Sequence, residues 1–406
     1  MHIKKMLATI TAVATILLSG QVTAGDQTRP PTASASNAVD SIVEQQMKEV
    51  GIVGLGAAII VNKKVVWTKG YGFADKEQSV PFTPNTIMGV ASIAKPFVGV
   101  AMMRAVHEGK LSLDEDINKY LPFRVVNPHH PNEIITLRHL ATHSSSITDR
   151  WEIYSAAYHY GGDSPEPLGR FLEQYFARDG KNYSRDNFLD AKPGALREYS
   201  NIGAALAGYI VERAFGEPLN VYTRKHIFTP LQMARTGWFL SEVDLANHSK
   251  LYVSHNDHIV PIPLYSITTY PDGGVRTSVT DLSKFFIALL NGGEYQGARI
   301  LDSSSTAEML RFQFTDANRP ENFPAAEGNS GLFWRTKLNG TRVGHGGNDP
   351  GVQTEMFSDL SKEVGVILFV NTSLSGPDQR ASVTIFAALW KHAVTLKNGE
   401  QQTSGK

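Results

Sequence analysis

The hydrophobic positions of this chain follow two different periods, one at both ends and another in the middle. In residues 37–51, NAVDSIVEQQMKEVG, apolar side chains recur three and four positions apart, which predicts an amphipathic helix. Residues 54–75, GLGAAIIVNKKVVWTKGYGFAD, form two apolar runs on either side of Asn62 and Lys63. This pattern predicts a β-hairpin that turns at that pair.

Strand-like patterns return near the C-terminus. Residues 331–345, GLFWRTKLNGTRVGH, contain the dipeptide Asn339-Gly340, a strong short-range signal for a hairpin. The runs VQTEMFSD and VGVILFVN enclose LSKE and predict a second hairpin. A last helical pattern, ASVTIFAALWKHAV, follows over residues 381–394.

The middle of the chain has mainly helical spacing, most clearly over residues 202–214 and 281–290. Strands thus lie at both ends of the sequence and helices lie between them. We therefore expect an α/β (α+β) fold, in which one antiparallel sheet is built from the N- and C-terminal segments and flanked by helices. The expected sheet-containing domain takes residues 37–91 and 325–396, and the mainly helical inserted domain takes residues 92–324.

The first residues have the features of a secretory signal peptide. Lys4 and Lys5 precede an apolar stretch and a small-residue cleavage site after Ala24, so we expect residues 1–24 to be removed. The alternative is an uncleaved anchor, but the stretch is shorter than the ~18 to 20 residues that a spanning helix needs. The expected location is periplasmic or secreted, with no stable membrane anchor after cleavage.

Two further segments are expected to lack fixed structure. Residues 25–36 form a polar, Pro- and Ser-containing linker, and residues 397–406 form a polar tail expected to be disordered. The 382 residues that remain after cleavage are enough for two domains or one large composite.

Composition narrows the possible partners. The chain contains no cysteine, so its stability must come from the core and not from disulfides. Without Lys4 and Lys5 the mature chain keeps 37 basic and 39 acidic side chains, a formal charge of −2. This balance gives no reason to expect nucleic acid or an anionic membrane as a partner, and it does not indicate an oligomeric state.

The sequence VASIAKPFVG places Ser92 and Lys95 three residues apart at the start of a predicted helix, and therefore on one face of it. Pro96 is tolerated only in a first turn, which sets the helix start near Ser92, and the apolar run that follows indicates burial. A serine hydroxyl becomes a nucleophile when a base takes its proton, and a desolvated lysine can be that base. The alternative is a chance pairing, but this is the only S-x-x-K in the chain.

Two further motifs carry candidate chemistry. In LREYSN, Tyr199 could pass a proton to a leaving group and Asn201 could hold Lys95 or a substrate amide, although Ser200 or Asn201 could also simply cap the next helix. In VGHGGND, His345 could assist Tyr199 or, when protonated, bind a substrate carboxylate. The alternative for this motif is a turn with an incidental histidine.

Taken together in this order, the three motifs resemble those of the serine beta-lactamase and penicillin-binding protein superfamily, in its class C-like branch. The segments KGYGFAD, ITLRHLATHSS, KPGALREYSN, IFTPLQM and PDGGVRTSVTDLSKF also look like family segments in family order. The resemblance covers most of the mature chain. It implies the beta-lactamase/transpeptidase-like fold.

The resemblance also implies a mechanism. Ser92 would attack a carbonyl carbon, Lys95 would act as base, and Tyr199 would protonate the leaving group. Asn201 would position Lys95 and contact the substrate. The oxyanion hole would consist of the backbone N–H groups of Ser92 and Asn348, and the acyl-enzyme would be hydrolysed or passed to another acceptor.

The third motif departs from the class C pattern at two positions. His345 stands where class C beta-lactamases have lysine, and Gly346 stands where many members have threonine. Gly346 and Gly347 would border the substrate and allow close backbone approach. A histidine at this position resembles the DD-peptidase, aminopeptidase and esterase members of the family. It argues against efficient beta-lactam hydrolysis, because a histidine offers the lactam carboxylate a cation only part of the time at neutral pH.

The expected function is that of a secreted serine hydrolase acting on small esters or amides, D-amino-acid peptides among them. The alternatives are a class C-like beta-lactamase, a penicillin-binding protein that acylates without turnover, and a scaffold that has lost the chemistry. We expect no metal and no cofactor: His139 and His143 have a zinc-like spacing, but Leu140 stands where the metalloprotease motif needs glutamate. Three tyrosines are expected to serve packing or to line a substrate cleft: Tyr154, Tyr158 and Tyr160.

Overall fold

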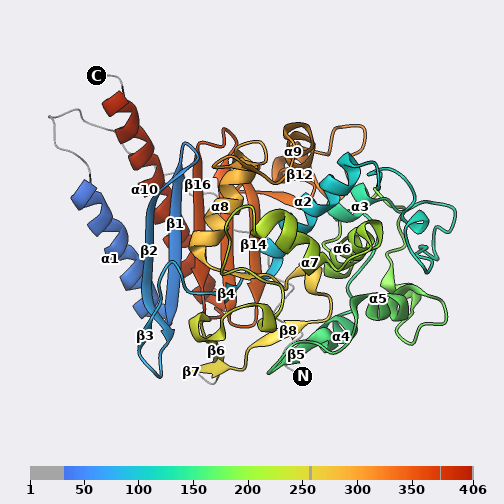
Figure 1. Ribbon diagram of the computed structural model, residues 1–406, viewed down its shortest axis with the longest axis horizontal. Helices are drawn as coiled ribbons and strands as arrows, with labels where there is room; N and C mark the ends of the chain where they lie inside the picture. Colours follow the sequence, from blue (N-terminus) through green and yellow to red (C-terminus); the bar gives the residue numbers. More distant parts are fainter. Residues whose placement is uncertain (1–31, 256–257, 375, 405–406) are drawn as a thin grey trace.

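The computed structural model describes residues 32–404 apart from 256–257 and 375 (Figure 1). The predicted signal peptide, residues 1–24, lies outside the described residues, and so does the first part of the predicted linker. In the described part of the chain no helix combines the length and the apolar character needed to cross a bilayer.

One antiparallel sheet of eight strands dominates the fold. Its strand order is β12-β13-β14-β15-β16-β1-β2-β3, so the two ends of the sequence meet between β16 and β1. There Leu55 pairs with Val370, and Val61 pairs with Val364. The strands, in chain order, are β1 (Gly54–Val61), β2 (Lys64–Asp75), β3 (Val80–Pro81), β12 (Ser330–Gly331), β13 (Trp334–Lys337), β14 (Arg342–Asp349), β15 (Val352–Asp359) and β16 (Val364–Val370).

The hairpins predicted from the sequence are confirmed. Asn62 and Lys63 both have positive φ, 47° and 63°, as a two-residue hairpin turn requires. Asn339 and Gly340, with φ of 53° and 79°, lie in the loop that joins β13 to β14. β15 and β16 form the third predicted hairpin.

Helices cover both faces of the sheet. Figure 1 shows α1 (Thr32–Val50) and α10 (Gln379–Ser404) side by side along one face. The core under them contains Leu55 and Ile59 of β1, whereas Ala58 and Ile60 of the same strand belong to the core on the opposite face. Because β1 is covered on both sides, it is apolar throughout and does not alternate.

Both terminal helices are longer than the sequence analysis predicted. α1 begins at Thr32, inside the segment 25–36 that was expected to be a linker. α10 continues to Ser404 through the segment 397–406 that was expected to be disordered. Lys397 forms an ion pair of 2.5 Å with Glu363, which holds this last part of α10 to the sheet.

The opposite face carries α8 and, beyond it, a mainly helical region. α8 (Val279–Leu290) packs on β1, and α2 (Ala94–His107) contacts α6 (Asn201–Phe215). The remaining helices are α3 (Leu137–Ala141), α4 (Trp151–Tyr154), α5 (Leu168–Phe176), α7 (Leu219–Thr223) and α9 (Ser303–Leu310). Two-stranded ribbons join them: β4 (Met88–Gly89) with β9 (Arg276–Thr277), β5 (Tyr158–Tyr160) with β8 (Tyr265–Ile267), β6 (Leu251–His255) with β7 (His258–Ile262), and β10 (Glu294–Tyr295) with β11 (Ala298–Arg299).

The expected fold class is confirmed: an antiparallel sheet from both ends of the chain, flanked by helices, with a mainly helical insertion. The domain boundaries after residues 91 and 324 stay a prediction. α8 belongs to the segment 92–324 in sequence, yet it packs on the sheet.

Candidate active site

Ser92 lies in a single 3-10 turn, η2 (Ala91–Ile93), which leads into α2. The residue before it, Ala91, has a φ of 48°, a left-handed conformation that costs an alanine about 1–2 kcal/mol. A strained residue next to a serine persists only when its surroundings hold it there. The strain therefore marks η2 as a segment fixed by its neighbours.

Strand β14 is the neighbour that holds η2. A Cβ atom on Gly347 would lie 2.3 Å from the carbonyl oxygen of Val90 and 2.9 Å from the Cβ of Ala91, so only glycine allows this approach. Thr354 of β15 donates a hydrogen bond of 2.9 Å to the same carbonyl oxygen. Gly347 thus lets β14 pass close to the segment that carries Ser92, and the close approach to a substrate expected at this motif stays a prediction.

Lys95 is completely buried, and its ammonium group lies at the centre of the candidate site. Its Nζ is 3.0 Å from Ser92 Oγ, 2.7 Å from Asn201 Oδ1 and 2.8 Å from the backbone oxygen of Asp272. Three oxygens thus surround the nitrogen, one for each of its three hydrogen or lone-pair positions. The structure brings together Ser92, Lys95 and Asn201 as the sequence predicted.

Two of those three oxygens can only accept hydrogen bonds. A carbonyl oxygen has no proton to give, so Asn201 Oδ1 and the Asp272 backbone oxygen must each receive an N–H from Lys95. The hydroxyl of Ser92 can either accept or donate. A neutral lysine amine would therefore direct its two N–H groups to Asn201 and Asp272 and its lone pair to Ser92.

Tyr199 lies beside this amine, immediately before α6. Its ring centroid is 5.0 Å from Lys95 Nζ and 6.4 Å from the ring centroid of His345. On another side the ring packs against His143, with 4.2 Å between ring centroids. The tyrosine is thus held between the lysine and two imidazoles.

The N-terminus of α6 is fixed by Asp149, which sequence analysis did not single out. Its carboxylate accepts hydrogen bonds from the backbone N–H groups of Asn201 and Ile202, at 2.7 and 3.0 Å, and from the Ser200 hydroxyl at 2.8 Å. Ser200 in turn caps the helix by accepting from the N–H of Gly203. Ser200 is therefore the cap, as expected, while Asn201 is free to hold Lys95.

Burial sets the charge of the groups around Tyr199. It raises the pKa of Asp149 in spite of its three hydrogen bonds, and it holds the pKa of His143 well below its usual range. His143 Nδ1 accepts the backbone N–H of Ser200 at 3.3 Å, which requires an unprotonated nitrogen there. His143 is thus an uncharged side chain in the wall of the site. In the sequence, the only indication that it belongs to this site was its place in the family segment HLATHSS.

His345 is also neutral. Burial, followed by the nearby charge of Arg335, holds the pKa of its imidazole well below the usual range. Its Nδ1 is 2.7 Å from the carbonyl oxygen of Gly346, so this nitrogen carries the proton and Nε2 is left as an acceptor. Of the two roles considered for His345, binding a substrate carboxylate as a cation does not fit this ring.

Asn348 lies on the exposed part of β14, three residues after His345. β13 pairs only with the first residues of β14, from Arg342 to Gly344, so the rest of that strand edge is available to η2. Gly346 and Gly347 lie in this part, directly before Asn348. The arrangement places the backbone of Asn348 on the stretch of β14 that passes η2.

No metal site is found in the part of the chain that the structure describes. The two histidines with zinc-like spacing have other partners: Nδ1 of His139 accepts the N–H of Thr136 in a capping box, and burial lowers its pKa to about 4. His143 packs on Tyr199.

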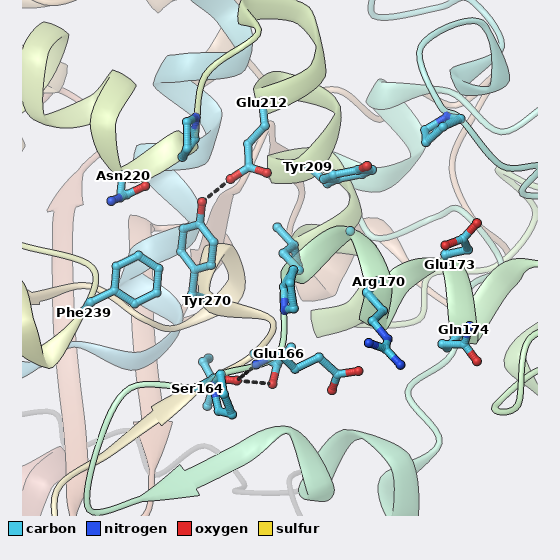
Figure 2. A pocket seen from close by; sticks show the side chains of 18 of the residues that line it. Ser164, Glu166, Arg170, Glu173, Gln174, Tyr209, Glu212, Asn220, Phe239 and Tyr270 are labelled. Carbon is cyan, nitrogen blue, oxygen red and sulfur yellow. Dashed lines mark hydrogen bonds between the residues drawn. The ribbon is translucent and has the colours of Figure 1, made fainter.

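A cavity of about 820 Å³ lies between α5, α6 and η9 (Tyr270–Asp272), away from the serine (Figure 2). Figure 2 shows Tyr270 in its wall, where the phenol donates a hydrogen bond to the carboxylate of Glu212. Ser92, Lys95 and Tyr199 are not among its lining residues. The cavity is therefore separate from the candidate active site, although α6 and η9 contribute residues to both.

Comparison of the sequence with known proteins finds a matching family model and several relatives. A family model described as Beta-lactamase matches residues 39–389. Protein flp of Staphylococcus aureus strain MRSA252 is 28% identical over 262 residues, which cover 64% of this chain and 50% of that protein. The putative penicillin-binding protein PbpX of Bacillus subtilis strain 168 is 27% identical over 255 residues, covering 62% of this chain and 59% of that protein. The chain thus spans about half the length of the first of these relatives and under two thirds of the second.

Solved structures with the same fold include two enzymes and a homologue of penicillin-binding proteins. The octameric penicillin-binding protein homologue from Pyrococcus abyssi is 27% identical with a TM-score of 0.69, covering 89% of this chain and 77% of that one. D-amino acid amidase from Ochrobactrum anthropi SV3 is 22% identical with a TM-score of 0.68, covering 88% of this chain and 99% of that one. EstCE1, a hydrolase with promiscuous acyltransferase activity, is 21% identical with a TM-score of 0.70, covering 88% and 98%. At these last two identities the likeness concerns the fold.

Proposed function

The chain belongs to the beta-lactamase family, and we propose that it is a secreted serine hydrolase that forms an acyl-enzyme at Ser92. The proposed substrates are small esters or amides, including peptides that contain D-amino acids. Lys95 is the base in this proposal, and Tyr199 delivers the proton to the leaving group.

The observation that carries the proposal is the environment of Lys95 Nζ. It is 3.0 Å from Ser92 Oγ, and its other two contacts are obligate acceptors. A neutral amine in this position can satisfy both acceptors and still take the proton of Ser92. A surface lysine with solvent around it would not be restricted in this way.

The proposed reaction begins when Ser92 Oγ passes its proton to Lys95 Nζ and attacks the carbonyl carbon of the substrate. The backbone N–H groups of Ser92 and Asn348 stabilise the negative oxygen that forms. Tyr199 protonates the leaving alcohol or amine as its bond to carbon breaks, and is reprotonated from Lys95. Water then hydrolyses the ester on Ser92.

The neutral ring of His345 supports the choice of substrate class. A beta-lactam carries a carboxylate, and this position of β14 offers it no cation because burial keeps the imidazole uncharged. The names of the structural relatives, an amidase for D-amino acids and penicillin-binding homologues, favour D-aminoacyl substrates. A class C-like beta-lactamase and a penicillin-binding protein without turnover remain the alternatives.

Intact-mass measurement after addition of a penicillin tests the acyl-enzyme and separates the alternatives. We expect the mass of the protein to increase by the mass of one penicillin, with no increase for Ser92→Ala. An adduct that lasts for hours supports the proposed class, whereas rapid loss with consumption of penicillin would identify a beta-lactamase.

Small esters and D-aminoacyl amides complete that experiment. If wild type neither forms an adduct nor hydrolyses any of them, the proposed function is wrong although the fold stands. An adduct that persists while all esters and amides stay intact would favour the penicillin-binding protein without turnover.

Tyr199→Phe is expected to lower kcat/KM for an amide by roughly 10²–10³-fold, the usual contribution of a general acid. The ring and its packing on His143 remain, so only the hydroxyl is lost. An aryl ester, whose leaving group departs as a stable anion, should be affected much less. Steady-state rates on a matched amide and aryl ester measure this difference.

Tyr160→Phe is the control, because Tyr160 is 54% exposed on β5 and has no place in the proposed chemistry. Equal losses for the amide and the aryl ester would assign Tyr199 a purely structural role. A wild-type rate on the amide would transfer the proton step to another group.

A further inference from the structure

The chain buries an aspartate beside Lys95. Asp272 is the last residue of η9 and is only 1% exposed; its backbone oxygen holds Lys95 Nζ at 2.8 Å. Its carboxyl Oδ1 accepts a hydrogen bond of 2.9 Å from the hydroxyl of Tyr154. The other carboxyl oxygen, Oδ2, is buried and makes no well-aligned hydrogen bond within the described part of the chain. The side chain of Thr269 is the polar group beside it.

A second aspartate lies against the first. Asp349, at the end of β14, is partly exposed as a residue, but its carboxyl group is enclosed by protein. Oδ1 accepts a hydrogen bond of 2.5 Å from Tyr158, and Oδ2 lies 3.5 Å from the place a Cβ on Gly273 would take. The rings of Tyr154 and Tyr158 meet edge to face at 5.8 Å. The carboxyl pair, defined as Asp272 and Asp349, is thus linked through two tyrosines.

Several elements face the carboxyl pair with charged or titratable groups. The only cations among the charges that act on it are the ammonium of Lys95 from α2 and, for Asp349, the guanidinium of Arg276 from β9. Two further titratable groups act on the neighbours of the carboxyl pair. Together with burial, the charge of Asp149 helps to raise the pKa of Tyr154. His248 lies near Arg276, and burial together with the charge of that arginine lowers the pKa of the histidine. The groups in direct range, element by element, are Lys95 (α2), Tyr154 (α4), Tyr158 (β5), Tyr265 (β8) and Arg276 (β9).

Burial makes the carboxyl pair titrate near neutral pH. It raises the pKa of Asp272 to about 7, with the charge of Lys95 acting in the opposite direction. It raises the pKa of Asp349 to about 6, against the hydrogen bond from Tyr158 and the charge of Lys95. Both carboxyl groups are therefore neutral at acidic pH and become charged as the pH rises through about 6 for Asp349 and about 7 for Asp272.

We propose that Asp272 and Asp349 are positioning residues for Lys95, and that their ionisation holds the proton on its amine and so sets the acid limit of Ser92 acylation. The inference rests on the proposed function, because it concerns the lysine as base. Neither aspartate touches the substrate in this proposal.

The physical reason is the attraction between a carboxylate and an ammonium, which is stronger in a buried site than in solvent. Each ionised carboxylate beside Lys95 stabilises its protonated form, in which the lone pair needed by Ser92 is absent. Tyr154 and Tyr158 hold the two carboxyl groups in place, and the Asp272 backbone oxygen fixes the amine relative to them. Removing a carboxylate should therefore let Lys95 act as a base at lower pH.

The test is the pH profile of kcat/KM on a small ester for Asp272→Asn and Asp349→Asn. Asparagine keeps an oxygen that accepts from the tyrosine, removes the ionisation, and replaces the other carboxyl oxygen by an NH2 group of similar size. We expect the acid limb of the profile to move to lower pH by about one unit in each variant. Asp179→Asn, the same change at an exposed position after α5, should leave the profile unchanged.

A second readout does not depend on activity. A carboxyl group whose pKa is higher in the folded than in the unfolded chain, where it is near 3.8, favours folding at low pH. That advantage is lost as pH rises from about 4 to 7, so wild type should lose stability relative to Asp272→Asn across this range. Denaturant unfolding of both proteins at several pH values measures the difference.

The outcomes separate the inference from the proposed function. An active wild type whose variants keep its acid limb, or move it to higher pH, would overturn the inference alone, and parallel stability curves would do the same. An inactive wild type would remove the proposed function and the inference with it. If Asp272→Asn fails to fold, Asp349→Asn carries both measurements.

Discussion

Ser92→Ala is expected to lower kcat/KM by roughly 10⁴–10⁶-fold on every substrate that wild type hydrolyses. The change removes the only hydroxyl that contacts Lys95 Nζ among the described residues. Without it the amine has no proton to take and the carbonyl carbon has no nucleophile. Initial rates on an aryl ester and a D-aminoacyl amide measure the loss.

The fold should survive this change. Ser92 contributes one hydrogen bond to Lys95, worth about 1 kcal/mol, and its turn is held by β14 through Gly347 and not by its own side chain. Thermal unfolding should therefore shift by only a few degrees. Ser304→Ala, at an exposed position of α9, is the matched control and should keep full activity. Hydrolysis retained by folded Ser92→Ala would remove the serine from its role.

The parts of the site that the sequence predicted share one property: their geometry is local. Ser92 and Lys95 are three residues apart, and Ser200 and Asn201 begin a helix, so helical spacing alone places each pair. The hairpin turn at Asn62 could be predicted for the same reason, because its two residues adopt positive φ within a single turn. Joining these local pieces needed a family resemblance, since Lys95 and Asn201 are 106 residues apart.

The groups that sequence analysis missed act across long separations, and the family segment that contains Asp272 did not mark it as a buried residue. Asp149 caps α6 from 52 residues away in the chain, and Asp272 reaches Tyr154 over 118 residues. An aspartate in a loop is usually a solvated residue, and only the tertiary structure shows that these are buried. The uncharged state of the His345 imidazole could not be predicted from the sequence for the same reason, because it results from burial in the folded protein.

Element ends were harder to predict than elements. The pattern located α1 and α10 correctly, but polar residues at their outer ends were expected to be unstructured. Thr32 begins α1 although the next five residues are only alanine, serine and asparagine, and α10 runs to Ser404 with Lys397 paired to Glu363. Contacts of this kind stabilise a helical end whose sequence has no apolar stripe.

Lys95→Met is expected to lower kcat/KM by roughly 10³–10⁵-fold, which is the combined loss of base and of nucleophile orientation. Methionine has a similar length and no charge, so it fills the space of the buried side chain. Asn201 Oδ1 and the Asp272 backbone oxygen lose their donor, which costs about 1–3 kcal/mol for each buried group left unpaired. The buried polar group of Lys95 is removed at the same time, and this gain offsets part of that cost.

The pH profile distinguishes a base from a merely structural lysine. If Lys95 is the base, the residual activity of Lys95→Met should rise in proportion to hydroxide, without the acid limb of wild type. Lys181→Met, at an exposed position, is the control for the same substitution and should keep the wild-type profile. A folded Lys95→Met with an unchanged acid limb, or with a rate within about tenfold of wild type, would place the base elsewhere, and the carboxyl pair beneath it would lose its proposed role as well.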